Sequence, residues 1–110
     1  MIPFSQIQAF SQQIADKFQP DRIILFGSYA CSKPTEDSDV DLLVILPFEE
    51  LPVQKAIDIR QQVRASFPLD LMARTPEQIQ QRLDMGDFFI QEILQTGRVL
   101  YESNNARVGE

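Results

Sequence analysis

Residues 22–46 have the sequence Arg22-Ile-Ile-Leu-Phe-Gly-Ser-Tyr-Ala-Cys-Ser-Lys-Pro-Thr-Glu-Asp-Ser-Asp-Val-Asp-Leu-Leu-Val-Ile-Leu46. Two apolar runs flank a small polar loop in this stretch. Each run is short, rich in Ile, Val and Leu, and bounded by turn residues, which is the pattern of a buried strand. The stretch therefore predicts two strands, residues 22–26 and 39–46, with Gly27-Ser28 directly after the first.

Two carboxylates, Asp39 and Asp41, stand at the start of the second predicted strand. Residues two apart in a strand point to the same face, about 6–7 Å apart along the chain, so we expect these side chains to lie together. Two like charges in that position are unfavourable unless a cation lies between them, and Mg²⁺ takes carboxylate, water and phosphate oxygens. The alternative is a pair of ordinary solvent-exposed residues, although Asp is depleted in strands.

Gly27 and Ser28 predict a phosphate-binding turn beside the carboxylates. A glycine after a strand lets the backbone turn sharply and approach a ligand closely. The serine offers a hydroxyl and a backbone N–H, and a helix that starts near it would favour an anion at its N-terminus. Together the two motifs are typical of a site for a nucleoside triphosphate.

Gly27-Ser28, ten intervening residues and Asp39-Val40-Asp41 resemble the Gly-Ser-x10-Asp-x-Asp signature of the DNA polymerase beta-like nucleotidyltransferase superfamily. The short chain is most similar to its minimal nucleotidyltransferase (MNT) branch, over residues 22–101. At Cys31-Ser32 the chain departs from the family, since many members have Arg-Gly there.

The resemblance implies a nucleotidyltransferase fold, ATP as co-substrate and two Mg²⁺ ions on Asp39, Asp41 and Asp70. It also implies that Asp70 activates the attacking hydroxyl. Asp70 stands between Leu69 and Leu71 in an apolar run, where an unpaired buried carboxylate costs several kcal/mol. The alternative for Asp70 is an edge-strand residue that faces water.

The resemblance further implies a partner. MNT proteins are typically encoded beside a HEPN-domain protein, so it implies an antitoxin that transfers AMP to a tyrosine of a HEPN ribonuclease toxin, with a hetero-oligomer as the working form. Two alternatives stay open: an enzyme that modifies a small molecule, as the aminoglycoside nucleotidyltransferases do, and a non-catalytic module that neutralises its partner by binding.

Composition narrows the class of protein. The 110 residues predict one domain, residues 1–101, followed by a disordered tail at 102–110. A net charge of −6 argues against a nucleic-acid substrate and suits a basic protein partner. The single cysteine rules out an internal disulfide and favours the cytoplasm. There is no histidine for acid–base chemistry, and no apolar run approaches the roughly 20 residues of a membrane helix.

The remaining pattern predicts an α/β fold in which helices pack on a small mixed sheet of three to four strands. Apolar residues at spacings of three and four predict the helices, and Thr75-Pro76 with Gln78 predicts a capped helix start. The other expected elements are helices at 4–18 with a Ser5–Gln8 capping box, at 29–32, at 53–67, at 76–83 and around 89–94 up to Gly97, and strands at 69–73 and 99–101. Arg74, Lys33 and Tyr29 are secondary candidates for the site, with a structural or solvent-exposed role as the alternative for each. Cys31 has no histidine partner and is expected to be a small packing residue. The phenylalanines stand at helical spacings and are expected to be core residues.

Overall fold

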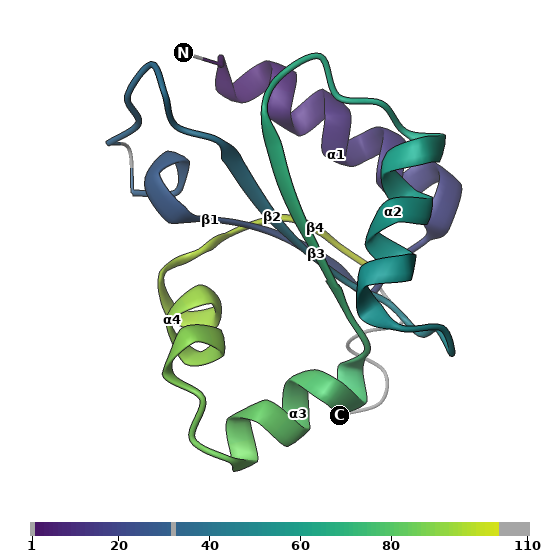
Figure 1. The fold of residues 1–110 in the computed structure, drawn as a ribbon. Helices are drawn as coiled ribbons and strands as arrows, with labels where there is room; N and C mark the ends of the chain where they lie inside the picture. The colour runs from purple at the N-terminus through teal and green to yellow at the C-terminus, as the bar shows by residue number, and fades with distance from the viewer. Residues whose placement is uncertain (1, 32, 104–110) are drawn as a thin grey trace.

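The computed structural model describes residues 2–31 and 33–103, and its element order alternates helices with the strands of one sheet (Figure 1). A single 3-10 turn, Gly27–Tyr29, follows the first strand. The other elements are α1 (Phe4–Phe18), β1 (Arg22–Phe26), β2 (Val40–Ile45), α2 (Pro52–Gln62), β3 (Leu69–Arg74), α3 (Pro76–Asp84), α4 (Phe88–Thr96) and β4 (Arg98–Glu102).

The four strands form one mixed sheet in the order β3-β2-β1-β4. β1 is antiparallel to both β2 and β4, whereas β2 and β3 are parallel. A parallel pair needs a long crossover connection, and α2 supplies it between β2 and β3. The predicted α/β fold with a small mixed sheet is therefore confirmed.

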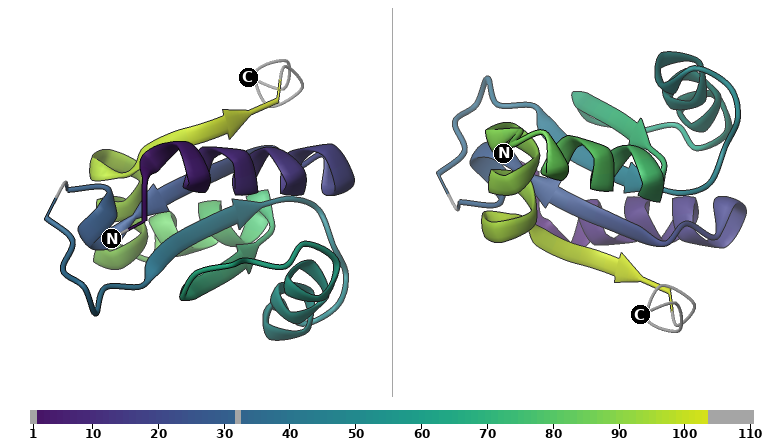
Figure 2. Two further views of the ribbon diagram at one scale, coloured as in Figure 1. Left: turned by 90° about the horizontal axis from the view of Figure 1, so that it is seen from above. Right: turned by 90° about the horizontal axis from the view of Figure 1, so that it is seen from below.

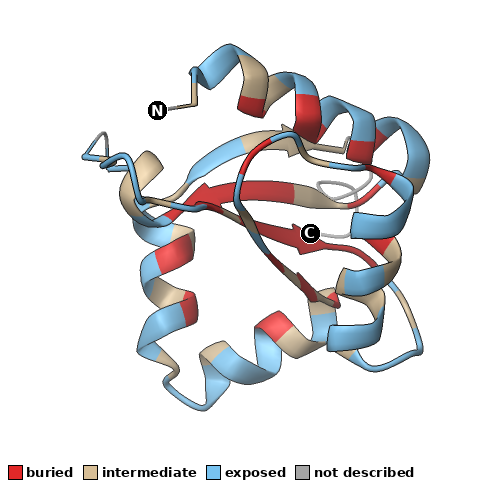
Figure 3. Ribbon diagram, turned by 45° about the horizontal axis from the view of Figure 1, so that its top comes forward, coloured by how far each residue is buried: buried red, intermediate tan, exposed pale blue. Residues whose placement is uncertain are grey.

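The helices lie in two layers, α1 and α2 on one face of the sheet and α3 and α4 on the other (Figure 2). Because alternate strand residues point to opposite faces, Ile23 and Leu25 pack toward α1 and α2, and Ile24 and Phe26 pack toward α3 and α4. With both faces covered, the central strands are buried along nearly their whole length, as the burial colours of Figure 3 show. This is why the sequence of these strands has continuous apolar runs instead of alternation.

The second helix ends earlier than the apolar spacing predicted. α2 stops at Gln62 instead of residue 67, and Val63 adopts an extended conformation (φ −127°, ψ 101°) where the chain turns toward β3. Val63 and Phe67 are still buried, and Phe67 packs edge-on against Phe10 with ring centroids 5.3 Å apart. The helical spacing thus identified core residues but placed the end of the helix wrongly.

The two predicted capping boxes have different outcomes. At α3 the box is confirmed, since Gln78 N donates to Thr75 Oγ1 and Thr75 N donates to Gln78 Oε1, both at 3.0 Å. At α1 it is wrong, because Pro3 is the N-cap and makes no side-chain cap. Gln8 instead donates from Nε2 to the carbonyl of Leu100 at 3.0 Å, which ties α1 to β4.

The C-terminal elements match the expected positions closely. α4 ends at Thr96, with Gly97 as its C-cap, and a Cβ at Gly97 would lie only 2.6 Å from Ile24 Cγ2. Glycine is therefore needed there for close packing of the α4–β4 turn on β1. β4 extends to Glu102, and residues 104–110 of the predicted tail lie outside the described residues. Among residues 2–31 and 33–103, none of the helices has the length and apolar character needed to cross a membrane.

Candidate active site

The Gly27 turn and the Asp41 carboxylate are in direct contact. Phe26 and Asp41 face each other in the antiparallel β1–β2 register, so the chain leaves β1 beside the start of β2. Gly27 has a φ of +75°, in the left-handed region that favours glycine, and begins the 3-10 turn. A Cβ at this position would overlap Asp41 Oδ2. Gly27 is therefore needed for two reasons: it allows the sharp turn, and it leaves room for the Asp41 carboxylate beside the backbone.

Asp41 and Asp70 are paired across two parallel strands. The β2–β3 register aligns Asp41 with Asp70, and adjacent strands are about 4.8 Å apart. The two residues lie on the face of the sheet that α3 and α4 cover, because Leu43 and Ile45 follow Asp41 by two and four positions and pack there. The fold thus joins carboxylates that are 29 residues apart in the sequence.

Asp39 directly precedes β2, which begins at Val40 instead of residue 39. Asp39 and Asp70 are exposed, whereas Asp41 is partly buried. Burial raises the pKa of the Asp41 carboxyl, and the nearby negative charges of Asp70 and Asp39 raise it further. The three predicted carboxylates therefore act on one another electrostatically, as a like-charge group.

None of the three carboxylates has a hydrogen-bond donor or a cationic side chain as partner among the described residues, and the same holds for the Ser28 hydroxyl. In the described part of the chain, no three His, Cys, Asp or Glu side chains form a group that could hold a metal ion. Mg²⁺ is usually held by one or two carboxylates together with substrate phosphates and waters. Asp41 and Asp70 have no other partner among the described residues, and their carboxylates are hard oxygen ligands of the kind in that donor set.

Asp70 is not a buried carboxylate. β3 is an edge strand and Asp70 is exposed on it, which agrees with the alternative of an edge-strand residue that faces water. The cost of burial therefore does not apply to Asp70. Asp70 stays a candidate for the active site because the β2–β3 register places it opposite Asp41. An exposed carboxylate is also accessible to a group that arrives from solvent.

The secondary candidates are separated by the fold. Arg74 lies at the opposite end of β3, four residues and roughly 13 Å from Asp70, so it does not adjoin the carboxylates. Tyr29 has a structural role, since its hydroxyl accepts a hydrogen bond from Ile2 N at 3.1 Å. Lys33 is exposed, and its backbone N–H donates to the Ser28 carbonyl at 3.0 Å. Cys31 was predicted to be a small packing residue, but it is exposed.

A pocket of about 130 Å³ adjoins the Gly27 turn and contains residues that sequence reasoning missed. It is lined by Phe26, Gly27, Cys31, Phe89, Glu92, Ile93 and Thr96. Phe89 was predicted to be a core residue but is 50% exposed. One signal for this was present in the sequence: successive helix positions are about 100° apart, so three adjacent apolar residues at 88–90 cannot all face the core.

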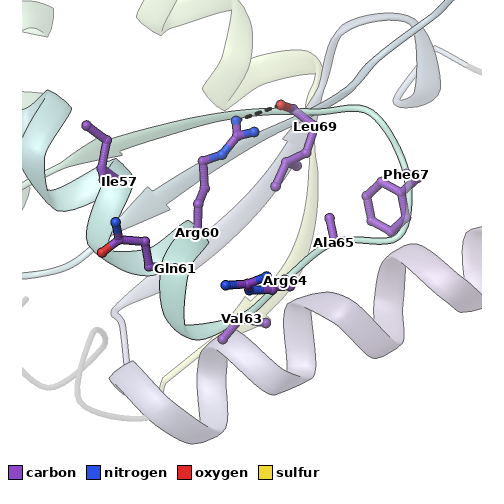
Figure 4. A pocket seen from close by; sticks show the side chains of 8 residues that line it. All are labelled: Ile57, Arg60, Gln61, Val63, Arg64, Ala65, Phe67 and Leu69. Atoms are coloured by element: carbon purple, nitrogen blue, oxygen red, sulfur yellow. Dashed lines mark hydrogen bonds between the residues drawn. The ribbon is translucent and has the colours of Figure 1, made fainter.

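A larger pocket of about 390 Å³ lies between α2 and the connection to β3 (Figure 4). Arg60 donates from Nη1 to the Leu69 carbonyl at 2.8 Å, and Ile57, Arg64 and Phe67 also line the pocket. It contains no carboxylate, so it offers no metal ligand of the predicted kind. The candidate active site is therefore the Gly27 turn with Asp39, Asp41 and Asp70.

The family follows from the sequence of nearly the whole chain. A family profile described as "Polymerase beta, Nucleotidyltransferase" matches residues 8–106, which include the Gly27 turn and all three carboxylates. The chain belongs to this nucleotidyltransferase family. It is also 37% identical over 66 residues to the protein adenylyltransferase MntA of Thermococcus cleftensis. That alignment covers 59% of this chain and 65% of MntA, slightly less than two thirds of the relative's length.

Solved structures of nucleotidyltransferases share the fold. A candidate nucleotidyltransferase from Sulfolobus solfataricus superposes with a TM-score of 0.62 at 14% identity, over 89% of this chain and 78% of the other. A toxin–antitoxin structure with AMP-PNP gives a TM-score of 0.59 at 17% identity. A mutant of the toxin–antitoxin MntA-HpeT gives 0.58 at 14%. The last two matches each cover 89% of this chain and 75% of the other, and at these identities they establish the fold alone.

Proposed function

We propose that this nucleotidyltransferase transfers AMP from ATP to a hydroxyl group of a partner protein, with Mg²⁺ as cofactor. The observation that carries the proposal is the alignment of Asp41 with Asp70 on one face of the sheet, with Asp41 in contact with the Gly27 turn. This arrangement brings carboxylate ligands and a backbone turn open to a phosphate within one small region. The family profile supports nucleotidyl transfer as the class of reaction.

In the proposed reaction the Gly27-Ser28 turn binds the phosphates through backbone N–H groups and the Ser28 hydroxyl, which has no other partner among the described residues. Asp39 and Asp41 would hold Mg²⁺, with Asp70 as a further ligand. When bound, Mg²⁺ supplies positive charge that neutralises the phosphates and offsets the repulsion among the carboxylates. The chain's own contribution is to position the two substrates and the charges around them.

Asp70 is proposed to accept the proton of the acceptor hydroxyl. The hydroxyl oxygen then forms a bond to the α-phosphorus, while the bond from that phosphorus to the bridging oxygen of the β-phosphate breaks. Pyrophosphate leaves with the electron pair, and AMP stays on the acceptor oxygen. The exposure of Asp70 suits this role, since a hydroxyl carried by another protein must reach it from solvent.

The acceptor is proposed to be a tyrosine of a HEPN-domain toxin, which the transfer would inactivate. MntA of Thermococcus cleftensis is described as a protein adenylyltransferase, and two structural neighbours are toxin–antitoxin structures. These similarities support the proposal for this chain. The acidic character of the chain, with a net charge of −6, also suits a basic protein as partner.

Intact-mass measurement of a purified HEPN-domain toxin tests the proposal. With the parent protein, ATP and Mg²⁺, the toxin should gain the mass of one or more AMP groups and lose ribonuclease activity. Asp41→Asn should reduce the mass gain to background. In chelator this variant should melt at the same temperature as the parent or higher, because it removes one of three mutually repelling charges.

Two outcomes contradict the proposal. If Asp41→Asn neutralises the toxin as fully as the parent does, with no covalent change, the chain is a binding module instead of an enzyme. If AMP is transferred to an aminoglycoside or a similar alcohol and not to the toxin, the chain is a small-molecule enzyme. A control variant, Asp16→Asn, alters an exposed carboxylate of α1 on the other face of the sheet and should transfer AMP at the parental rate.

A further inference from the structure

Three large apolar side chains are exposed around the turn between α3 and α4. Phe88 is 82% exposed, Met85 is 70% exposed and Phe89 is 50% exposed, and Figure 3 shows this turn mostly in the exposed colour. These three residues are called the Met85–Phe89 surface. Exposing single apolar residues is normal, but three within five positions form a concentrated apolar surface of the kind that marks an interaction site.

The turn that carries this surface is held by specific interactions. Gly86 has a φ of +78°, and its N–H donates to the Leu83 carbonyl at 3.0 Å. Asp87 caps α4 by accepting hydrogen bonds from Phe89 N at 2.9 Å and Ile90 N at 3.2 Å. The Asp87 carboxylate also pairs with Arg82 at 3.8 Å. The apolar side chains are thus presented by an ordered turn, which lowers the entropy cost of binding a partner.

The surface is continuous with the candidate active site. The Phe89 ring packs edge-on against Phe26, with ring centroids 5.8 Å apart, and Phe26 directly precedes Gly27. Phe89 and Gly27 also line the same 130 Å³ pocket. Both this pocket and the Asp41–Asp70 pair lie on the face that α3 and α4 cover. A protein bound at the Met85–Phe89 surface would therefore lie next to the reacting groups.

The charge around the surface indicates the kind of partner. Residues 82–97 contain three acidic residues, Asp84, Asp87 and Glu92, and one basic residue, Arg82, which pairs with Asp87. Only Asp87 of the three has an ion pair within the described residues. With Asp39, Asp41 and Asp70 on the same side of the sheet, this face is acidic. A second copy of the chain would bring like charges together, whereas a surface with apolar side chains ringed by lysine and arginine would be complementary.

We propose that the Met85–Phe89 surface docks the protein that carries the acceptor hydroxyl, through apolar contacts at its centre and basic residues at its rim. The proposal rests on the proposed function, since it assigns a docking surface to that reaction. Phe88 is the expected centre, because it is the most exposed of the three and aromatic residues dominate binding energy at interfaces.

The test uses Phe88→Ser with Leu51→Ser as its matched control. Leu51 is a similarly exposed apolar residue, at 72%, and it caps α2 on the other side of the sheet. Both variants should melt at the parental temperature and bind Mg²⁺-ATP as the parent does. Phe88→Ser should bind the purified HEPN-domain toxin about 10- to 100-fold more weakly, and the KM for the toxin should rise while kcat at saturating toxin stays unchanged. Leu51→Ser should retain the parental affinity.

The failures of the two proposals are distinguishable. If Phe88→Ser binds and modifies the toxin as the parent does, the docking surface is wrong while the proposed function stands. If the parent transfers no AMP to the toxin, the proposed function itself fails, whatever the Phe88 variant does. If the parent forms a dimer in light scattering that Phe88→Ser abolishes, the surface belongs to a second copy of the chain and the docking proposal is overturned.

Discussion

The two faces of the sheet differ in how much they bury and in what they carry. Among the described residues, the face covered by α1 and α2 contributes a cluster of fifteen buried residues, and the face covered by α3 and α4 a cluster of seven. The smaller cluster shares its face with Asp41, Asp70 and the exposed Phe88. The α1–α2 face therefore supplies most of the hydrophobic stabilisation. The α3–α4 face leaves accessible the groups that binding and chemistry require.

On the α3–α4 face, the largest effect we expect is a loss of AMP transfer in a protein that stays folded. Asp70→Asn should reduce the rate of AMP transfer about 10²- to 10⁴-fold, because it removes the proposed proton acceptor. The melting temperature should stay close to the parental value, since Asp70 is exposed and has no hydrogen-bond partner among the described residues. Binding of Mg²⁺-ATP, measured by calorimetry, should persist but be weaker than in the parent, because Asp39 and Asp41 remain as metal ligands. Near-parental turnover of the variant would make Asp70 a structural residue.

The α1–α2 face should show the opposite behaviour. Ile14→Ala removes a fully buried side chain of α1 and should destabilise the protein by about 2–5 kcal/mol in urea denaturation. Ile93→Ala, in the smaller cluster, should lie at the lower end of that range, because a thinner layer can relax around the deleted atoms. Under conditions where it is folded, Ile14→Ala should bind Mg²⁺-ATP normally. Equal losses in the free energy of unfolding for Ile14→Ala and Ile93→Ala would contradict the contrast between the faces.

The smallest effects should come from two glycines that share a left-handed conformation. Gly27→Ala and Gly86→Ala should each lose about 1 kcal/mol of stability from backbone strain. A Cβ at Gly86 has no heavy atom within 4 Å, whereas one at Gly27 would overlap the Asp41 carboxylate. Only Gly27→Ala should therefore lose affinity for Mg²⁺-ATP in calorimetry as well. Equal ATP affinities for the two folded variants would argue against the phosphate-binding turn.

The sequence alone determined the strands and most helix positions. β1, β2 and β3 are short apolar runs bounded by turn residues, and the Thr75 cap begins α3 where the pattern placed it. These elements follow from local chemistry, since periodicity, caps and glycine act within a few residues. The Gly27 turn and the Asp39–Asp41 spacing are local in the same sense, and they were sufficient to suggest the family.

Only the tertiary structure decided which residues meet and which are left exposed. The β2–β3 register aligns Asp70 with Asp41, although no spacing between distant residues encodes a strand register. α2 ends five residues early, at Gln62, because the chain must turn back into a parallel strand. Phe88 is a large apolar residue of the kind that is usually buried, but it is exposed. Burial depends on what packs against a helix as well as on the periodicity of the helix itself. The sequence therefore specified the elements and the kind of chemistry, and long-range packing decided the face on which the site and its apolar neighbour lie.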